Sequence, residues 1–193
     1  MLIKIVVVNL DSSILKVDVS EAKERLRKVL GVNGDLRKLV AEASTKSSNS
    51  RKVIDEILEE LEIKTAEEAK IDQEDLEAIC TLKAIGVKLA LVTMRGKKST
   101  EIVLERMNLK DVFDIVITRD DEAEKAKQIV KACNVLGHQV NDALYVGFSR
   151  ADAIAGLQAG CLVATPHKVL QAMSRIVNVN SLNELLNVFK FSV

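Results

Sequence analysis

Five short apolar runs, rich in valine, isoleucine and leucine, alternate with helical segments along most of this chain. The runs are residues 2–8, 87–92, 115–118, 143–146 and 162–164, and helical patterns follow four of them at about 97–107, 123–136, 150–158 and 181–189. Near-continuous apolar runs are typical of strands buried on both faces, which occur in parallel sheets covered by helices. The alternation therefore predicts an α/β fold, a parallel sheet of about five strands with helices on both faces.

Residues 18–85 interrupt this alternation because they carry mainly helical patterns. Helices are expected at 20–30, 34–43, 50–61 and 73–85, and apolar spacing at Val53, Ile57 and Leu61 marks the third as amphipathic. The charged stretch 56–74 is typical of the solvated face of such helices. We therefore expect a Rossmann-like core formed by residues 1–17 and 86–193, with residues 18–85 inserted as a helical cap over the carboxyl edge of the sheet.

Composition excludes several classes of partner. The 28 basic residues balance the 28 acidic residues, so no net field favours nucleic acid. Apolar runs such as 5–8 are far too short to span a bilayer, so no membrane partner is expected. The three cysteines, Cys80, Cys133 and Cys161, form no Cys-x-x-Cys pair, which predicts free thiols in a reducing, cytoplasmic compartment. These features leave the oligomeric state open.

Polar residues gather directly after the predicted strands, where parallel α/β sheets bind ligands. Asn9 and Asp11 follow the first strand, and Thr93 and Met94 follow the second. The other residues expected at this edge are Asp120, Asp121, Lys125, Phe148 and Asp152. A threonine hydroxyl, a lysine ammonium and backbone N–H groups at helix starts together make an anion site of phosphate size.

Four segments at this edge follow one another in a distinctive order. They are Asn9-Leu10-Asp11, an apolar strand ending in Thr93, Lys125 at a helix start, and Gly147–Asp152. This order resembles the haloacid dehalogenase superfamily, in particular its phosphatase-like members with a small helical cap. In that family the corresponding motifs are Asp-x-Asp, a strand ending in Thr or Ser, a lysine, and Gly-Asp-Ser-x-x-Asp. The resemblance covers essentially the whole chain apart from the cap.

The resemblance implies phosphoryl transfer through an aspartyl-phosphate. The family's first aspartate attacks phosphorus, and Asn9 stands at that position. Asp11 stands at the position of the general acid and base. Thr93, Met94 and Lys125 stand at phosphate-binding positions.

The resemblance also implies a magnesium ion. The family holds Mg²⁺ with the first aspartate, a backbone carbonyl and the first aspartate of the fourth motif, where this chain has Phe148. Asp152, the last aspartate of that motif, is retained and is a candidate catalytic residue. Lys127 is an alternative to Lys125 as the motif lysine.

Two of these positions carry groups that cannot perform the family's chemistry. An amide cannot act as a carboxylate nucleophile, and a phenyl ring cannot hold a metal. We interpret the chain as a non-catalytic or very weakly active phosphatase homologue, without a cofactor, that retains a site for an anion or a phosphate-containing small molecule. One alternative is an active phosphohydrolase that uses Asp11 or the Asp120–Asp121 pair with Mg²⁺. Another is an interaction or assembly protein that acts through the cap surface.

Overall fold

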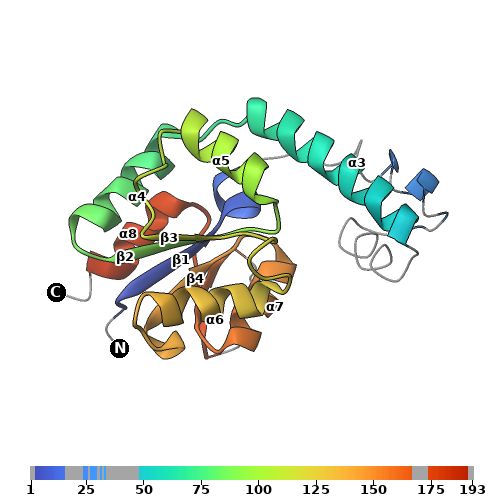
Figure 1. The fold of residues 1–193 in the computed structure, drawn as a ribbon. Helices are drawn as coiled ribbons and strands as arrows, with labels where there is room; N and C mark the ends of the chain where they lie inside the picture. The colour runs from blue at the N-terminus through green and yellow to red at the C-terminus, as the bar shows by residue number, and fades with distance from the viewer. Residues whose placement is uncertain are drawn as a thin grey trace.

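The computed structural model of the chain describes residues 3–15, 24–25, 27–29, 31, 33, 48–166 and 174–190. Within these residues, six parallel strands form one sheet in the order β3-β2-β1-β4-β5-β6 (Figure 1). The strands are β1 Ile5–Asn9, β2 Lys88–Val92, β3 Ile115–Ile117, β4 Ala143–Val146, β5 Leu162–Thr165 and β6 Ile176–Asn178. The predicted parallel α/β sheet is confirmed, with one strand more than expected.

The centre of the sheet is β1, which lies between β2 and β4. Asn9 aligns with Val92 on one side, and Val8 aligns with Val146 on the other. Every residue of β1 and of β4 is buried, as expected for strands covered on both faces. Because all the strands run in the same direction, their carboxyl ends meet at one edge of the sheet.

Helices cover both faces of the sheet (Figure 1). On one face lie α4 Gln73–Ala84, α5 Lys97–Arg106 and α8 Leu182–Lys190, and on the other lie α6 Lys125–Val135 and α7 Arg150–Ala159. Alternate β1 side chains point to the two faces: Val6 and Val8 pack into the first layer, Ile5 and Val7 into the second. No helix within the described ranges is both long and apolar enough to cross a membrane.

The sequence pattern missed β6. This strand has three residues, all at least partly exposed, and ends in Asn178 at the edge of the sheet beside β5. Only two apolar residues, Ile176 and Val177, precede Asn178, so the segment lacks a longer apolar run of the kind that marked the other strands. Helices α5 to α8 begin and end within two residues of the predicted ranges.

The insertion after β1 contributes helix α3, Ser48–Glu67, which is longer than the predicted 50–61 and packs against α5. The helix expected at 34–43 and most of the one expected at 20–30 lie outside the described residues. Helix α4 packs against α8 and adds Ile79 and Leu82 to the core beside the sheet. The division between core and cap at residue 85 stays a prediction, and the packing of α4 favours a boundary before Gln73.

Candidate functional site

Lys125 links the ends of two elements at the carboxyl edge of the sheet. It opens α6, and its Nζ donates hydrogen bonds to Asn9 Oδ1 at 2.9 Å and to Asp152 Oδ1 at 2.8 Å. Asn9 ends β1 and Asp152 lies in the first turn of α7, so three predicted site residues lie together. Lys127 instead pairs with Glu124 at 2.8 Å on the surface, away from this group.

Ser12 belongs to the same group, although the sequence analysis did not single it out. Its Oγ accepts hydrogen bonds from Asn9 Nδ2 at 2.8 Å and from the Phe148 backbone N–H at 3.0 Å, and donates to Asp152 Oδ2 at 2.7 Å. A π-helical turn, η1 Leu10–Ile14, directs the chain so that this hydroxyl reaches all three partners. Since a hydroxyl donates once and accepts twice, Ser12 uses its full capacity. The available sequence signal was its place within the turn that follows the first strand.

The orientation of the Asn9 amide follows from its partners. Lysine can only donate, so the amide oxygen faces Lys125 and the amide nitrogen faces Ser12. Asn9 is 1% exposed, and both ends of its amide are hydrogen-bonded. The group at the expected nucleophile position is therefore a buried amide held by its neighbours.

Asp152 is the buried anion of the site, with 3% of its surface exposed. It forms a capping box with Ser149 at the start of α7. The Ser149 N–H donates to Asp152 Oδ2 at 3.2 Å, and the Asp152 N–H donates to Ser149 Oγ at 3.1 Å. The two side chains also contact each other. Burial alone would raise the pKa of the Asp152 carboxyl, but the charge of Lys125, with hydrogen bonds from it and from two serines, holds that pKa below its usual range. A Cβ on Gly147 would lie 2.4 Å from Asp152 Cβ, so this approach requires glycine.

Arg95 is a second cation at this edge, and it pairs with Asp11. The Thr93 hydroxyl donates to Asp11 Oδ2 at 2.7 Å, and Arg95 Nε donates to Asp11 Oδ1 at 2.5 Å. Arg95 is 4% exposed, so this pair is shielded from water on the arginine side. The Met94 carbonyl accepts a hydrogen bond from Arg119 Nη1 at 2.8 Å. The residues expected to bind phosphate after β2 are thus engaged with partners from the chain itself.

The remaining candidate ligands are also engaged. The Phe148 ring packs against the apolar cluster on the α4 side of the sheet. Asp120 Oδ2 accepts the Lys97 backbone N–H at 2.7 Å. Asp121 Oδ2 accepts the Thr118 backbone N–H at 2.9 Å, a hydrogen bond that lowers the pKa of Asp121. Asp120 thereby holds the first residue of α5, and Asp121 holds the backbone just after β3.

The magnesium ion implied by the resemblance does not fit the residues present. A hard divalent cation needs several carboxylate or carbonyl oxygens, whereas the Asn9 oxygen already faces an ammonium group and Phe148 supplies no side-chain oxygen. Across the described part of the chain, no three His, Cys, Asp or Glu side chains are grouped so that they could hold a metal. The carboxylates of Asp11 and Asp152 each face one cation, which neutralises the site without a metal.

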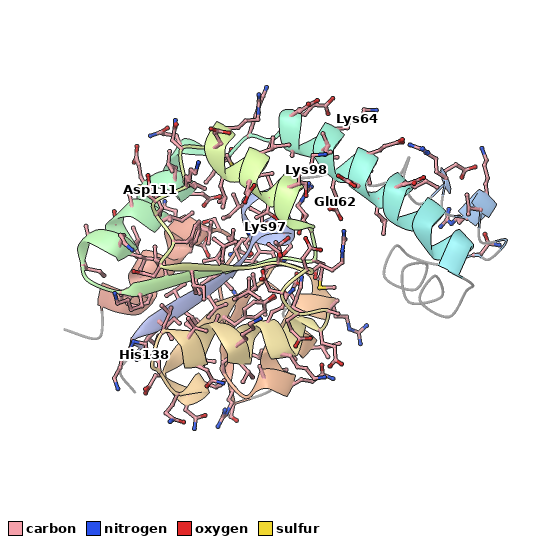
Figure 2. The ribbon with its side chains drawn as sticks, viewed as in Figure 1. Glu62, Lys64, Lys97, Lys98, Asp111 and His138 are labelled. Carbon is pink, nitrogen blue, oxygen red and sulfur yellow. The ribbon has the colours of Figure 1, made fainter. Side chains whose placement is uncertain are left out.

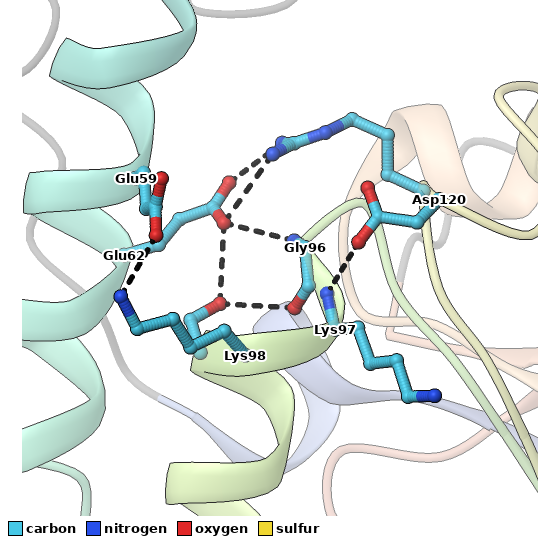
Figure 3. A pocket seen from close by; sticks show the side chains of 8 residues that line it. Glu59, Glu62, Gly96, Lys97, Lys98 and Asp120 are labelled. Atoms are coloured by element: carbon cyan, nitrogen blue, oxygen red, sulfur yellow. Dashed lines mark hydrogen bonds and ion pairs between the residues drawn. The ribbon is translucent and has the colours of Figure 1, made fainter.

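A cavity of about 410 Å³ lies between α3 and the start of α5, and Asn9, Lys125 and Asp152 are not among the residues that line it. Figure 2 shows Glu62, Lys97 and Lys98 together at this junction, with His138 on the far side of the molecule. Three acidic and three basic side chains line the cavity, so their charges balance (Figure 3). They are Glu59, Glu62 and Asp120, and Lys97, Lys98 and Arg119. Glu62 is only 9% exposed and faces α5, so the expectation that the charged stretch 56–74 forms a solvated face is wrong at this residue.

Sequence comparisons identify relatives among phosphatases. A family model described as haloacid dehalogenase-like hydrolase matches residues 6–165. A pyrophosphatase PpaX from Bacillus cereus is 34% identical over 92 residues, which are 46% of this chain and 42% of that protein. A phosphoglycolate phosphatase from Aquifex aeolicus is 34% identical over 86 residues, 43% of this chain and 40% of that protein. The matches thus span about two fifths of the length of these curated relatives.

Structural comparisons show the same fold over nearly the whole chain. A haloacid dehalogenase-like hydrolase from Streptococcus pneumoniae has a TM-score of 0.74 at 16% identity and covers 97% of this chain and 98% of its own. A HAD-superfamily hydrolase of subfamily IA from Geobacter sulfurreducens has a TM-score of 0.64 at 19% identity and covers 96% of both chains. At these identities the likeness concerns the fold alone.

Proposed function

The chain belongs to the haloacid dehalogenase-like hydrolase family, and from this premise we propose that it keeps a phosphatase fold without efficient phosphoryl transfer. Its active-site edge would be non-catalytic or very weakly active. The position of the covalent nucleophile carries Asn9, and that of a metal ligand carries Phe148. Loss of a covalent nucleophile removes a large part of the ~10⁶-fold or greater acceleration that enzymes supply.

The pairing of the surviving carboxylates is the observation that carries this proposal. Asp152 pairs with Lys125 at 2.8 Å and Asp11 pairs with Arg95 at 2.5 Å. A carboxylate that already neutralises a buried cation cannot leave that partner without exposing an unpaired charge, which is costly in a buried site. Neither carboxylate is therefore available to replace the missing nucleophile or to recruit Mg²⁺.

A weakened anion site is part of the proposal. The Lys125 ammonium and the Thr93 hydroxyl remain at the carboxyl edge, where an inorganic anion or a phosphate-containing small molecule would bind. Such a ligand must compete with Asp152 and Asp11 for the same donors. We therefore expect weak binding that needs no metal.

Turnover of phosphomonoesters by the wild type and an Asn9→Asp/Phe148→Asp double variant tests the proposal. Each protein is assayed for phosphate release with and without Mg²⁺, beside an Asn134→Asp control that adds a carboxylate on an exposed part of α6. We expect turnover only in the double variant with Mg²⁺. Metal-dependent turnover by the wild type that is lost in Asp11→Asn would overturn the proposal and favour the active alternative.

The other two hypotheses gain no specific support from the described residues. An active site built on Asp120 and Asp121 would first have to release the backbone N–H groups that these side chains hold. Assembly through the cap surface would be favoured if neither the wild type nor the double variant binds phosphate or turns over.

A further inference from the structure

The side chain of Glu62 connects helix α3 to the carboxyl edge of the sheet. Glu62 projects from α3 towards the start of α5, where its Oε2 accepts the Gly96 backbone N–H at 2.8 Å and the Ser99 hydroxyl at 3.1 Å (Figure 3). The first N–H groups of a helix have no partner within the helix and attract anions. Glu62 therefore supplies an anion to α5 from another part of the chain.

Arg119, from the loop after β3, completes the surroundings of this carboxylate. Its Nη1 donates to Glu62 Oε1 at 2.6 Å and to the Met94 carbonyl at 2.8 Å. The Glu62 and Arg119 side chains are 12% and 25% exposed, so water screens this pair less than it screens a surface pair. One carboxylate thus joins α3 to two separate segments of the core.

Arg95 makes a second connection to α3. Its Nη1 donates to the Glu62 backbone carbonyl and its Nη2 to Thr65 Oγ1, both at 2.8 Å. The Nε of the same guanidinium holds Asp11. The position of α3 is therefore coupled through one rigid, planar group to a residue of the candidate active site.

We infer that Glu62, Arg119 and Arg95 form a built-in clasp that holds α3 closed over the carboxyl edge without a ligand. Glu62 accepts the Gly96 N–H before α5, and Asp120 accepts the Lys97 N–H that opens α5, so side chains of the chain itself already hold both donors. A ligand large enough to need α3 moved must break at least the Glu62 contacts. The inference stands apart from the proposed function, because the clasp does not involve Asn9 or Phe148.

Hydrogen exchange of α3 tests the clasp, with a matched control on the same helix. Glu59 lies one turn before Glu62 and pairs with Lys98 at 3.0 Å, but both side chains of that pair are more than half exposed, at 53% and 69%. Glu62→Gln and Glu59→Gln each remove one charge and keep the side-chain shape. Exchange is followed by mass spectrometry in peptides covering residues 56–67, with α4 and α8 as the internal reference.

We expect Glu62→Gln to accelerate exchange in α3 about tenfold or more, since it weakens several charge-assisted hydrogen bonds. Glu59→Gln should change it less than about twofold, because exposed pairs contribute little. Arg119→Gln should also accelerate α3, and adding it to Glu62→Gln should produce little further change. Equal α3 exchange in the two glutamate variants, or additive effects of Glu62→Gln and Arg119→Gln, would overturn the inference. So would equal acceleration of α4 and α8, which would indicate global destabilisation.

Discussion

Replacing Lys125 by methionine removes the ammonium group beside Asp152 while keeping an unbranched apolar side chain of similar length. In the wild type, the side chains of this pair are only 15% and 5% exposed. The variant leaves the Asp152 carboxylate buried without its cation. We therefore expect a large loss in the free energy of unfolding at pH 7.

The size of the loss follows from the contacts that remain. Breaking a buried ion pair by removing one partner costs about 3–5 kcal/mol. Asp152 keeps hydrogen bonds from Ser12 Oγ at 2.7 Å and from the Ser149 N–H at 3.2 Å, which favour the lower end of that range. A loss of about 3 kcal/mol corresponds to a decrease in Tm of roughly 6–12 °C for a chain of this size.

Urea unfolding of three proteins measures the effect. Lys127→Met is the control, because Lys127 pairs with Glu124 on the exposed surface, and we expect no measurable change. Adding Asp152→Asn to Lys125→Met removes the stranded charge and should recover part of the stability. If Lys125→Met is as stable as Lys127→Met, Lys125 does not neutralise Asp152 and the description of the site as charge-balanced is wrong.

Lys125→Met should also change how the free energy of unfolding depends on pH. The pKa of Asp152 is lower in the folded chain than its usual value, so its contribution to stability is present above about pH 4 and is lost as pH falls through the folded pKa. Without Lys125, burial dominates and raises that pKa, so acid relieves the unpaired charge. The stability difference between the wild type and Lys125→Met should therefore be largest at neutral pH and shrink towards pH 4.

Three further changes give separate tests. Asn9→Asp alone should lower stability by about 1–2 kcal/mol at pH 7 in EDTA, because two carboxylates would share Lys125; unchanged urea unfolding would contradict this. Gly156→Ala should lower the free energy of unfolding by about 1–3 kcal/mol, because the added Cβ would lie 2.7 Å from Tyr145 Cδ1. An unchanged Tm in a thermal melt would contradict the described packing of α7. Under native conditions a thiol reagent should modify only Cys80, because Cys133 and Cys161 are buried. Burial raises the pKa of Cys133 to about 11 and that of Cys161 to about 12. Rapid labelling of all three thiols would contradict this expectation.

The core of the fold was predictable because burial on both faces leaves a direct mark on the sequence. Strands β1 and β4 consist almost entirely of aliphatic residues, and the structure buries all of them. The same rule fails at β6, because only Ile176 and Val177 of this strand are apolar and both are partly exposed. The end of α3 at Glu67 was also missed, since its last turns carry charged residues that the apolar periodicity does not include.

The candidate site was predictable only to the level of which residues share an edge. Parallel strands place their carboxyl ends together, which is sufficient to bring Asn9, Lys125 and Asp152 into one group. The partners of these residues depend on side-chain orientation and on the π-helical turn after β1, neither of which has a periodic signal. Ser12 and Glu62 were missed for this reason: each acts through a contact made across the fold rather than along the chain.

The charge balance at the carboxyl edge connects the replacements at positions 9 and 148. With carboxylates at positions 9 and 148 as well as Asp11 and Asp152, the edge would carry four negative charges against Lys125 and Arg95, and a divalent cation would be needed to balance them. With an amide and a phenyl ring at those positions, two carboxylates face two cations. Restoring either position alone adds a negative charge without completing a metal site. Only the double variant can therefore reveal whether the scaffold still supports the family's chemistry.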